Sequence, residues 1–319
     1  MKKFIVTTTI HKPSIALLLY SLREDWELII VSDLKTPHAY FLNMKCLYLF
    51  PDFQDHFYKD LSDAIGWNCI QRRNIGILEA YKRGADIVAL VDDDNSPHSF
   101  WDTECFIGEG FENFWAVNGN HICLDPISIA CNSTKVPSHR GYPIELQNKR
   151  GVNTIVKSKE NNTDKVHIQA NMWDGDWDID ALSRIEYNEQ LKFPVFEPFY
   201  CKQFSPFNSQ NTMLSREVLS KYFLFPHIGR MDDIWASYYV EACGYKPVYA
   251  KSTVYQHRNK HDLLVDITNE YMGYKNNMLL LEALSENPDN IKHFLPQQSW
   301  DAFQIYREYF DDKRVDKQI

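Results

Sequence analysis

The chain has 319 residues, of which 44% are hydrophobic and 14% aromatic, so it can form one large domain or two ordinary ones. Its 12 glycines and 14 prolines are too few for a disordered or fibrous protein. The formal net charge of −9 argues against general binding to nucleic acid, because the phosphates would be repelled.

The distribution of apolar residues and cysteines indicates a cytoplasmic protein. No stretch is long and apolar enough for a transmembrane helix, and the apolar run near the first residue is too short for a signal peptide. The seven cysteines are odd in number, widely spaced and without a CxxC motif. This pattern is typical of free thiols in a reducing compartment.

The first 91 residues alternate between expected strands and expected helices. Apolar spacing predicts helices over residues 14–24 and 71–84, and Gly84 ends the second of them. Short connections between elements of this kind predict an α/β fold with a mostly parallel sheet and helices on both sides. The expected strands are apolar or β-branched runs at residues 2–10 (KKFIVTTTI), 26–33 (WELIIVSD), 46–50 (CLYLF) and 85–91 (ADIVALV).

The rest of the chain is less regular. Residues 100–165 are polar and basic in places, and we expect surface loops or a mobile flap there. From Asp262 onward the spacing predicts a helical tail packed through one stripe. Further strands and helices are expected at 165–186, 208–223, 231–245 and 246–262, and the stripe consists of Leu263, Ile267, Tyr271, Tyr274 and Met278.

Three aspartates, Asp92 to Asp94, directly follow the expected strand at residues 85–91. A solvated loop is one explanation, but ligands collect at the carboxyl ends of parallel strands. No P-loop, EF-hand, GxGxxG or GxSxG motif is present to account for the charges. Asp92 and Asp94 form a D-x-D pair, whose hard oxygens suit Mg²⁺ or Mn²⁺ bound together with substrate phosphates.

Four segments in the same order resemble glycosyltransferases of the GT-A type. They are similar to the STELLO-like glycosyltransferases and to the plant reversibly glycosylated polypeptides, which are UDP-arabinopyranose mutases. The resemblance covers residues 4 to about 275, although the chain lacks the membrane anchor of STELLO-like proteins. The segments are VSDLKTP, QRRNIGILEAYKRGADIVALVDDDN, QANMWDGDWDIDALSR, and NSQNTMLSREVL followed by IGRMDDIWASYYVEACGY and VYQH.

This resemblance implies a GT-A fold, a Rossmann-like sheet flanked by helices. Residues 1–261 would form the catalytic domain, with a nucleotide-binding half (1–99) and an acceptor half (100–261), and residues 262–319 a helical extension. The implied activity is metal-dependent transfer of a sugar from a nucleoside diphosphate sugar, with UDP as the expected nucleotide, to a glycan or other hydroxyl acceptor. A UDP-sugar mutase and a non-catalytic nucleotide-sugar-binding subunit stay open as alternatives, as does a homo-oligomer.

The resemblance also assigns roles on the donor side. The end of the first expected strand would lie under the nucleotide base, and Asp33 could accept a hydrogen bond from a uracil imide, with Lys35 near the phosphates. Arg73 would bind the diphosphate through charge-assisted hydrogen bonds, whereas we interpret Arg72 as a solvated helix-start residue. The full set of expected nucleotide-binding residues is Thr8, Thr9, Asp33, Lys35, Arg73, Asn74 and Asp93.

The expected metal and acceptor sites involve residues far apart in the chain. His257 would complete the metal site formed by Asp92 and Asp94, with Mn²⁺ or Mg²⁺ as the ion. Asp233 would be the general base that deprotonates the acceptor, with Asp232 in contact with the acceptor sugar, although two aspartates at a helix start also fit a cap. Further candidates for sugar contacts are Asp178, Asp180, Trp173 and Trp177, the tryptophans being equally consistent with core packing.

Overall fold

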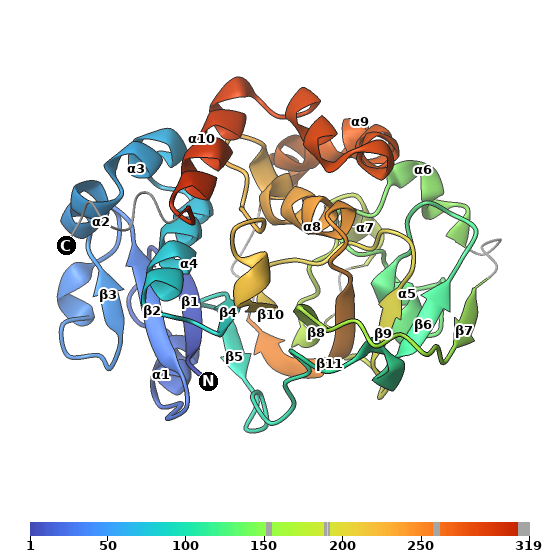
Figure 1. Cartoon of the computed structure of the whole chain (residues 1–319), viewed down its shortest axis with the longest axis horizontal. Coiled ribbons are helices and arrows are strands. Elements are labelled where there is room, and N and C mark those ends of the chain that lie inside the picture. The colour runs from blue at the N-terminus through green and yellow to red at the C-terminus, as the bar shows by residue number, and fades with distance from the viewer. Residues whose placement is uncertain (151–154, 188–189, 191, 258–261, 312–319) are drawn as a thin grey trace.

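The computed structural model describes residues 1–150, 155–187, 190, 192–257 and 262–311. Within them one mixed 11-stranded sheet crosses the molecule, with helices against it (Figure 1). The expected α/β architecture is therefore confirmed. The strands are β1 (Lys3–Thr9), β2 (Glu27–Ser32), β3 (Leu47–Leu49), β4 (Ile87–Val91), β5 (Asn95–Pro97), β6 (Trp115–Asn118), β7 (Val156–Ser158), β8 (Ile168–Gly175), β9 (Phe199–Cys201), β10 (Asn211–Ser215) and β11 (Pro247–Gln256).

The helices α3, α4, α8, α9 and α10 lie along the upper side of the sheet in Figure 1, and α1 lies at its lower left. Short 3-10 turns connect several of them. The α-helices are α1 (Ile15–Ser21), α2 (Pro51–Phe57), α3 (Lys59–Ile65), α4 (Arg73–Lys82), α5 (Pro126–Ala130), α6 (Ile144–Gln147), α7 (Ser183–Glu186), α8 (Asp232–Ala242), α9 (Leu263–Glu286) and α10 (Gln297–Glu308). The 3-10 turns are η1 (His38–Tyr40), η2 (Ile70–Arg72), η3 (Phe111–Asn113), η5 (Arg216–Val218), η6 (Gly229–Met231) and η7 (Pro288–His293).

The sheet changes character along its length. Its strand order is β3-β2-β1-β4-β10-β8-β11-β9-β6-β7, with β5 paired to β11. The first four of these strands are parallel, whereas β10 runs antiparallel to both β4 and β8. Because β1 has β2 on one side and β4 on the other, the chain order reverses there. Such a reversal leaves a crevice at the carboxyl ends of the strands, where ligands bind in open α/β sheets.

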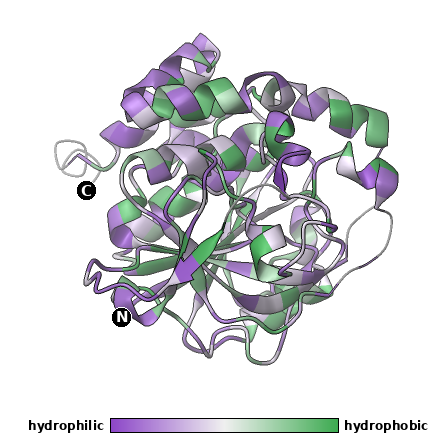
Figure 2. Cartoon of the chain, turned by 90° about the vertical axis from the view of Figure 1, so that its right-hand side faces the viewer, coloured by the Kyte–Doolittle hydropathy of each residue, from purple (hydrophilic) through white to green (hydrophobic). Residues whose placement is uncertain are grey.

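The buried strands form the centre of the hydrophobic core, and Figure 2 shows hydrophobic residues running through the sheet. All five residues of β4 are buried, as expected for a strand covered on both faces. Helix α10 joins the same core: the rings of Phe223 and Phe303 lie 5.4 Å apart, and Tyr306 donates a hydrogen bond to the Leu219 carbonyl. Among the described residues, no helix combines the length and hydropathy needed to cross a membrane.

Three expectations from the sequence were wrong in part. The strand expected within residues 208–223 is present as β10, but the turn η5 follows it where a helix was expected. Residues 100–165 are not only surface loops, because they supply β6 and β7 to the sheet and the buried His139 and Arg140. The stripe expected to bury the tail is half-buried except for Tyr271, which is 63% exposed, and the fully buried residues of α9 are others.

The expected boundary between a main domain and a tail at residue 261 lies outside the described residues. The division into 1–261 and 262–319 therefore stays a prediction.

Helix α4 packs unusually close to the sheet at Gly76. A Cβ atom at this position would lie 2.5 Å from Val6 Cγ1 and 2.7 Å from Val31 Cγ2. Alanine would add about 1 kcal/mol of helix propensity, but overpacking a dense core costs about 1–3 kcal/mol. Because the two valines are fixed in β1 and β2, we expect Gly76→Ala to lower the free energy of unfolding measured with urea.

The matched control for this prediction is Gly110→Ala. A Cβ atom there would meet the carboxylate of Glu112, which is the mobile end of a long side chain and can rotate away. We expect this variant to differ from wild type by less than about 1 kcal/mol. Equal stability of both variants and wild type would contradict the tight packing of α4.

Candidate active site

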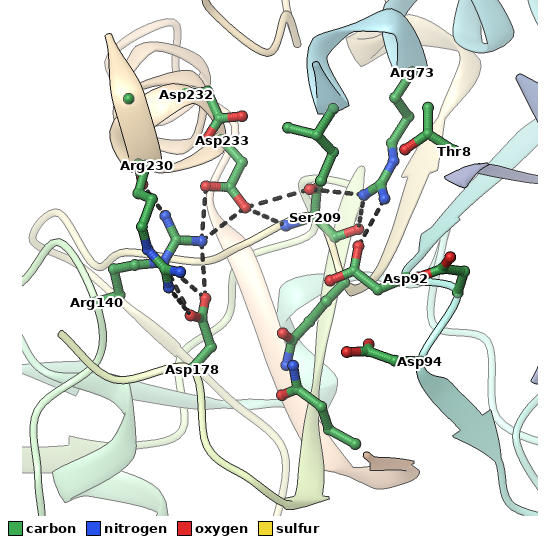
Figure 3. A pocket seen from close by; sticks show the side chains of 15 residues that line it. Thr8, Arg73, Asp92, Asp94, Arg140, Asp178, Ser209, Arg230, Asp232 and Asp233 are labelled. Carbon is green, nitrogen blue, oxygen red and sulfur yellow. Dashed lines mark hydrogen bonds and ion pairs between the residues drawn. The ribbon is translucent and has the colours of Figure 1, made fainter. Parts of the chain in front are cut away.

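A cavity of about 320 Å³ opens at the carboxyl ends of the central strands. It lies where β1 and β4 end, beside the first turn of α8 (Figure 3). Three arginines and six aspartates contribute to its wall, so the cavity is acidic overall. The lining consists of Thr8, Ile70, Arg73, Asp92, Asp93, Asp94, Arg140, Asp178, Ser209, Gln210, Gly229, Arg230, Asp232, Asp233 and Gln256.

The three consecutive aspartates after β4 point to different partners. Asp92 forms an ion pair with Arg73, with 2.6 Å between Oδ1 and Nη2. Asp93 accepts a hydrogen bond from the Thr9 hydroxyl at the end of β1, and burial raises the pKa of its carboxyl. Asp94 lines the cavity, and its carbonyl accepts a hydrogen bond from the His257 backbone N–H at 3.0 Å. The partners of the Asp92 and Asp93 carboxylates relieve part of the repulsion expected of three adjacent carboxylates.

His257 follows β11 and therefore reaches the same strand end as Asp94, although its side chain is exposed. The imidazole lies 4.6 Å from the Tyr255 ring between centroids. Within the described ranges, no three His, Cys, Asp or Glu side chains are grouped closely enough to hold a metal ion by themselves. Asp92, Asp94 and His257 therefore do not form a closed protein ligand set, and a metal at this place stays a prediction.

The two residues that begin α4 differ in their relation to this cavity. Arg73 is buried, donates to both the carbonyl and the hydroxyl oxygen of Ser209, and faces the cavity. Asn74 is equally buried, but its amide exchanges two hydrogen bonds with the Leu224 backbone and does not line the cavity.

Arg72 is not the solvated residue expected from the sequence. It is completely buried, its Cζ lies 3.3 Å from the Trp67 ring centroid, and it donates to Gln54, Ser62 and the Gly66 carbonyl. Burial lowers the pKa of its guanidinium to about 10. The correction has a simple cause: residues 70–72 form the turn η2, which directs this side chain inward below α4.

A smaller cavity of about 210 Å³ adjoins the first and shares Thr8, Ile70 and Asp93 with it. Thr9 and Asp33 line it as well, so the predicted nucleotide-binding residues from β1 and β2 are brought together. The Asp33 carboxylate already accepts hydrogen bonds from the backbone N–H groups of Leu34, Asn68 and Cys69. Lys35 is exposed and lines neither cavity.

The opposite wall is formed by the first turn of α8, where Asp232 and Asp233 are both 5% exposed. Asp233 accepts hydrogen bonds from the Ser209 backbone N–H and forms an ion pair with Arg140 at 2.9 Å. Asp232 accepts a hydrogen bond from the Gln71 amide at 2.7 Å. Burial and the neighbouring Asp233 raise the pKa of the Asp232 carboxyl to about 7. The two adjacent aspartates therefore differ in their partners: Asp233 has a guanidinium partner, and Asp232 has an amide donor and a raised pKa.

Arg140 is a central residue of the site that the sequence did not identify. Its Nη2 lies 2.8 Å from Asp178 and 2.9 Å from Asp233, and Nη1 donates to the Arg230 carbonyl. It comes from the segment VPSHRGY, where a proline, a serine and a glycine resemble an ordinary surface loop. No local pattern distinguishes such an arginine, because its partners are 38 and 93 positions away in the chain.

Ser209 connects the two acidic groups of the cavity. Its N–H and hydroxyl face Asp233, while its carbonyl and hydroxyl oxygen accept hydrogen bonds from Arg73, which in turn holds Asp92. Figure 3 shows this order from Asp233 through Ser209 and Arg73 to Asp92. A displacement of Asp233 can therefore alter the position of Asp92 through Ser209 and Arg73.

The segment WDGDWDID supplies one cavity residue out of the four suggested as sugar contacts. Asp178 lines the cavity, whereas Asp180 accepts hydrogen bonds from the N–H and hydroxyl of Ser183 at the start of α7. Trp173 and Trp177 are buried beside Phe193, with the Trp177 ring stacked at 4.1 Å between centroids. Core packing is thus the role that the structure gives to both tryptophans.

Comparison with known proteins assigns neither a family nor a function to the chain. No protein-family model matches the chain, and no curated protein matches it. One similar solved structure is titled "Crystal Structure of A197 from STIV", with 12% sequence identity and a TM-score of 0.34 over 81% of this chain and 87% of that chain. A likeness this distant carries no argument about function.

The raised pKa of Asp232 predicts a pH-dependent loss of stability. An unfolded aspartate ionises near pH 4, whereas the folded carboxyl ionises near 7. Folding therefore takes up a proton between these pH values, and wild-type stability falls as the pH rises from about 4 to about 7. We expect Asp232→Asn to be more stable than wild type at pH 8, with the difference shrinking toward pH 4, in urea unfolding across that range.

Asp233→Asn is the comparison variant. Because it leaves the buried Arg140 without one of its carboxylate partners, it should be less stable than wild type at neutral pH. An Asp232→Asn variant that is destabilised at pH 8 to the same extent would contradict the different electrostatic character of the two residues.

Proposed function

We propose that the protein is a metal-dependent glycosyltransferase of the GT-A type that uses a nucleoside diphosphate sugar, with UDP as the nucleotide. The observation that carries the proposal is the pairing of two acidic groups on opposite walls of one cavity. Asp92 and Asp94 end a parallel strand on one wall, and Asp232 and Asp233 begin α8 on the other. One pair would serve the donor diphosphate and the other the acceptor hydroxyl.

The donor wall has the chemistry that a divalent ion and a diphosphate require. Two carboxylates with hard oxygens fit Mg²⁺ or Mn²⁺, which take their remaining ligands from phosphates and water. When bound, such an ion would neutralise negative charge on the departing diphosphate. Arg73, which is buried and held by Ser209, supplies a fixed positive charge at the same wall. The smaller cavity next to it offers space for the nucleoside.

On the acceptor wall, the contacts favour Asp232 as the general base, which exchanges the roles expected from the sequence. Asp233 is paired with Arg140 and bound by Ser209, so its carboxylate is already engaged by other groups. Asp232 accepts a hydrogen bond from the Gln71 amide, and its pKa, raised to about 7 by burial and by the neighbouring Asp233, is matched to neutral pH.

The transfer then follows from these positions. Asp232 takes the proton of the acceptor hydroxyl, the acceptor oxygen forms a bond to the anomeric carbon, and the bond from that carbon to the diphosphate oxygen breaks. The nucleoside diphosphate leaves with the electron pair of that bond. The ion pair of Asp233 and Arg140 holds the first turn of α8 in place, and because both side chains are buried they limit the access of water to this wall.

The function is tested by incubating the protein with a panel of UDP-sugars and Mn²⁺, with and without hydroxyl acceptors. UDP release that depends on an acceptor supports the transferase. Ring isomerisation of the donor without UDP release would indicate a mutase, and saturable binding without any turnover would indicate a binding subunit.

Loss of the divalent ion should stop turnover. We expect EDTA to abolish UDP release and added Mn²⁺ to restore it, because the acidic cavity repels an uncompensated diphosphate. Asp94→Asn should reproduce the effect of EDTA in the presence of Mn²⁺, with an unchanged circular dichroism spectrum.

The control for the metal prediction is Asp102→Asn, which removes an aspartate paired with Arg23 at 2.8 Å outside the cavity. This variant should keep wild-type turnover. Full activity of the wild-type protein after exhaustive chelation would rule out the metal.

Removing the proposed base should separate chemistry from donor binding. Asp232→Asn keeps the size and the Gln71 hydrogen-bond acceptor, so donor affinity measured by calorimetry should stay within a few-fold of wild type. The rate of transfer should fall by about 10²–10⁴-fold, the usual contribution of a general base. In wild type, the rate should decline as the pH falls below about 7, because Asp232 becomes protonated.

Asp233→Asn serves as the comparison. If Asp233→Asn loses transfer activity and the decline of the rate below about pH 7, while Asp232→Asn keeps both, the base is Asp233, as the resemblance implied.

A further inference from the structure

The first half of helix α9 contacts the rest of the protein through a polar face, whereas its second half buries leucines in the core. Its buried residues include Asp266, Glu270, Gly273 and Asn277, and Glu270 is completely inaccessible to solvent. A buried carboxylate costs free energy unless it is paired, so its partners indicate what the face is for. Those partners lead from α9 toward the cavity.

Arg230 in η6 is the link between α9 and the site. Its Nε lies 2.8 Å from Glu270, and its Nη1 lies 3.2 Å from Asp266. The remaining Nη2 lies 3.3 Å from Asp178, which lines the cavity. Each side of the guanidinium thus faces its own carboxylate, Asp266 and Asp178 through hydrogen bonds and Glu270 as an ion pair, and the three together orient the group.

From Asp178 the chain of charges continues to the proposed catalytic wall. Asp178 is shared between Arg230 and Arg140, and Arg140 pairs with Asp233 beside the proposed base. Figure 3 shows the side chains of Arg140 and Arg230 both reaching the Asp178 carboxylate, below the first turn of α8. Alternating charges therefore run from Glu270 on α9 to Asp233 on α8.

The backbone reinforces this connection. Gly229, next to Arg230, has a φ of +65°, and a Cβ atom there would lie 2.2 Å from the Asn269 carbonyl oxygen of α9. A Cβ atom at Gly273 would meet Met231 Sδ at 2.3 Å. The two glycines let η6 and α9 approach each other closely, so Arg230 starts from a fixed position.

Both oxygens of Glu270 have partners. Oε1 faces Arg230, while Oε2 accepts hydrogen bonds from the Ala181 N–H at 2.7 Å and the Tyr274 hydroxyl at 2.6 Å. A glutamine has the same size but only one acceptor oxygen. In either orientation its amide group would direct N–H toward one of these donors, so the group cannot satisfy both sides.

We propose that Glu270 is a positioning residue of the cavity, which acts through Arg230 and Asp178 to hold Arg140 against Asp233. The proposal rests on the proposed function for its kinetic consequence, since the residue itself does not line the cavity. Helix α9 would then contribute to the geometry of the site in addition to covering the core.

The test compares Glu270→Gln with Glu241→Gln. Glu241 is also completely buried, both of its oxygens face the Ser205 N–H, one of them also pairs with Lys246, and it lies at the far end of α8 from the cavity. We expect Glu270→Gln to lower kcat by about tenfold or more with donor KM within about twofold of wild type. Glu241→Gln, with a similar loss of Tm, should keep its kcat.

A crystal structure of Glu270→Gln provides a readout that does not need activity. The proposal expects Arg230 to turn away from its present contacts and the Arg140–Asp233 pair to open relative to wild type. If Arg230, Asp178, Arg140 and Asp233 superimpose on the wild-type positions, or if both glutamine variants lower kcat equally, the proposal is overturned. If wild type turns over no donor, the proposed function fails, and the crystal structure alone decides the role of Glu270.

Discussion

The arrangement of this molecule depends on how six aspartates are accommodated around one cavity. Like charges at such short range repel, and each carboxylate loses water when it is buried. Three arginines compensate for part of this charge: Arg73 for Asp92, Arg140 for Asp178 and Asp233, and Arg230 for Asp178 from the other side. Compensation is incomplete, and this excess of negative charge is the property that would attract a divalent cation together with an anionic donor.

Incomplete compensation of charge also explains why the pKa of Asp232 is raised. Asp233 forms an ion pair with Arg140, whereas the preceding Asp232 accepts a hydrogen bond from the Gln71 amide. Burial and the neighbouring Asp233 raise the pKa of the Asp232 carboxyl to about 7, because Arg140 offsets them only in part. One residue of helix rotation thus places a carboxylate paired with an arginine beside one whose pKa is raised.

The same need for compensation determines how α9 packs. A helix that covers a core usually presents an apolar stripe, but α9 presents Asp266 and Glu270 to Arg230 and an asparagine, Asn277, to the Gly141 carbonyl and the Trp235 indole. The buried face of the first half of this helix is polar because Arg230 lies between it and the cavity, while Leu280, Leu281 and Leu284 of the second half pack in the core. Packing and site geometry are therefore coupled in this region.

The sequence by itself determined the elements that local patterns encode. It placed β1, β2, β3 and β4, the helix α4 and the acidic strand end at Asp92–Asp94, because continuous apolar runs and helical spacing are local properties. Only the tertiary structure decided which distant residues meet. It buried Arg72, brought Arg140 from an apparent loop to the centre of the cavity, and turned the polar face of α9 inward. The physical reason is that a charged side chain is buried only where partners from remote segments compensate for it, and no local pattern records those partners.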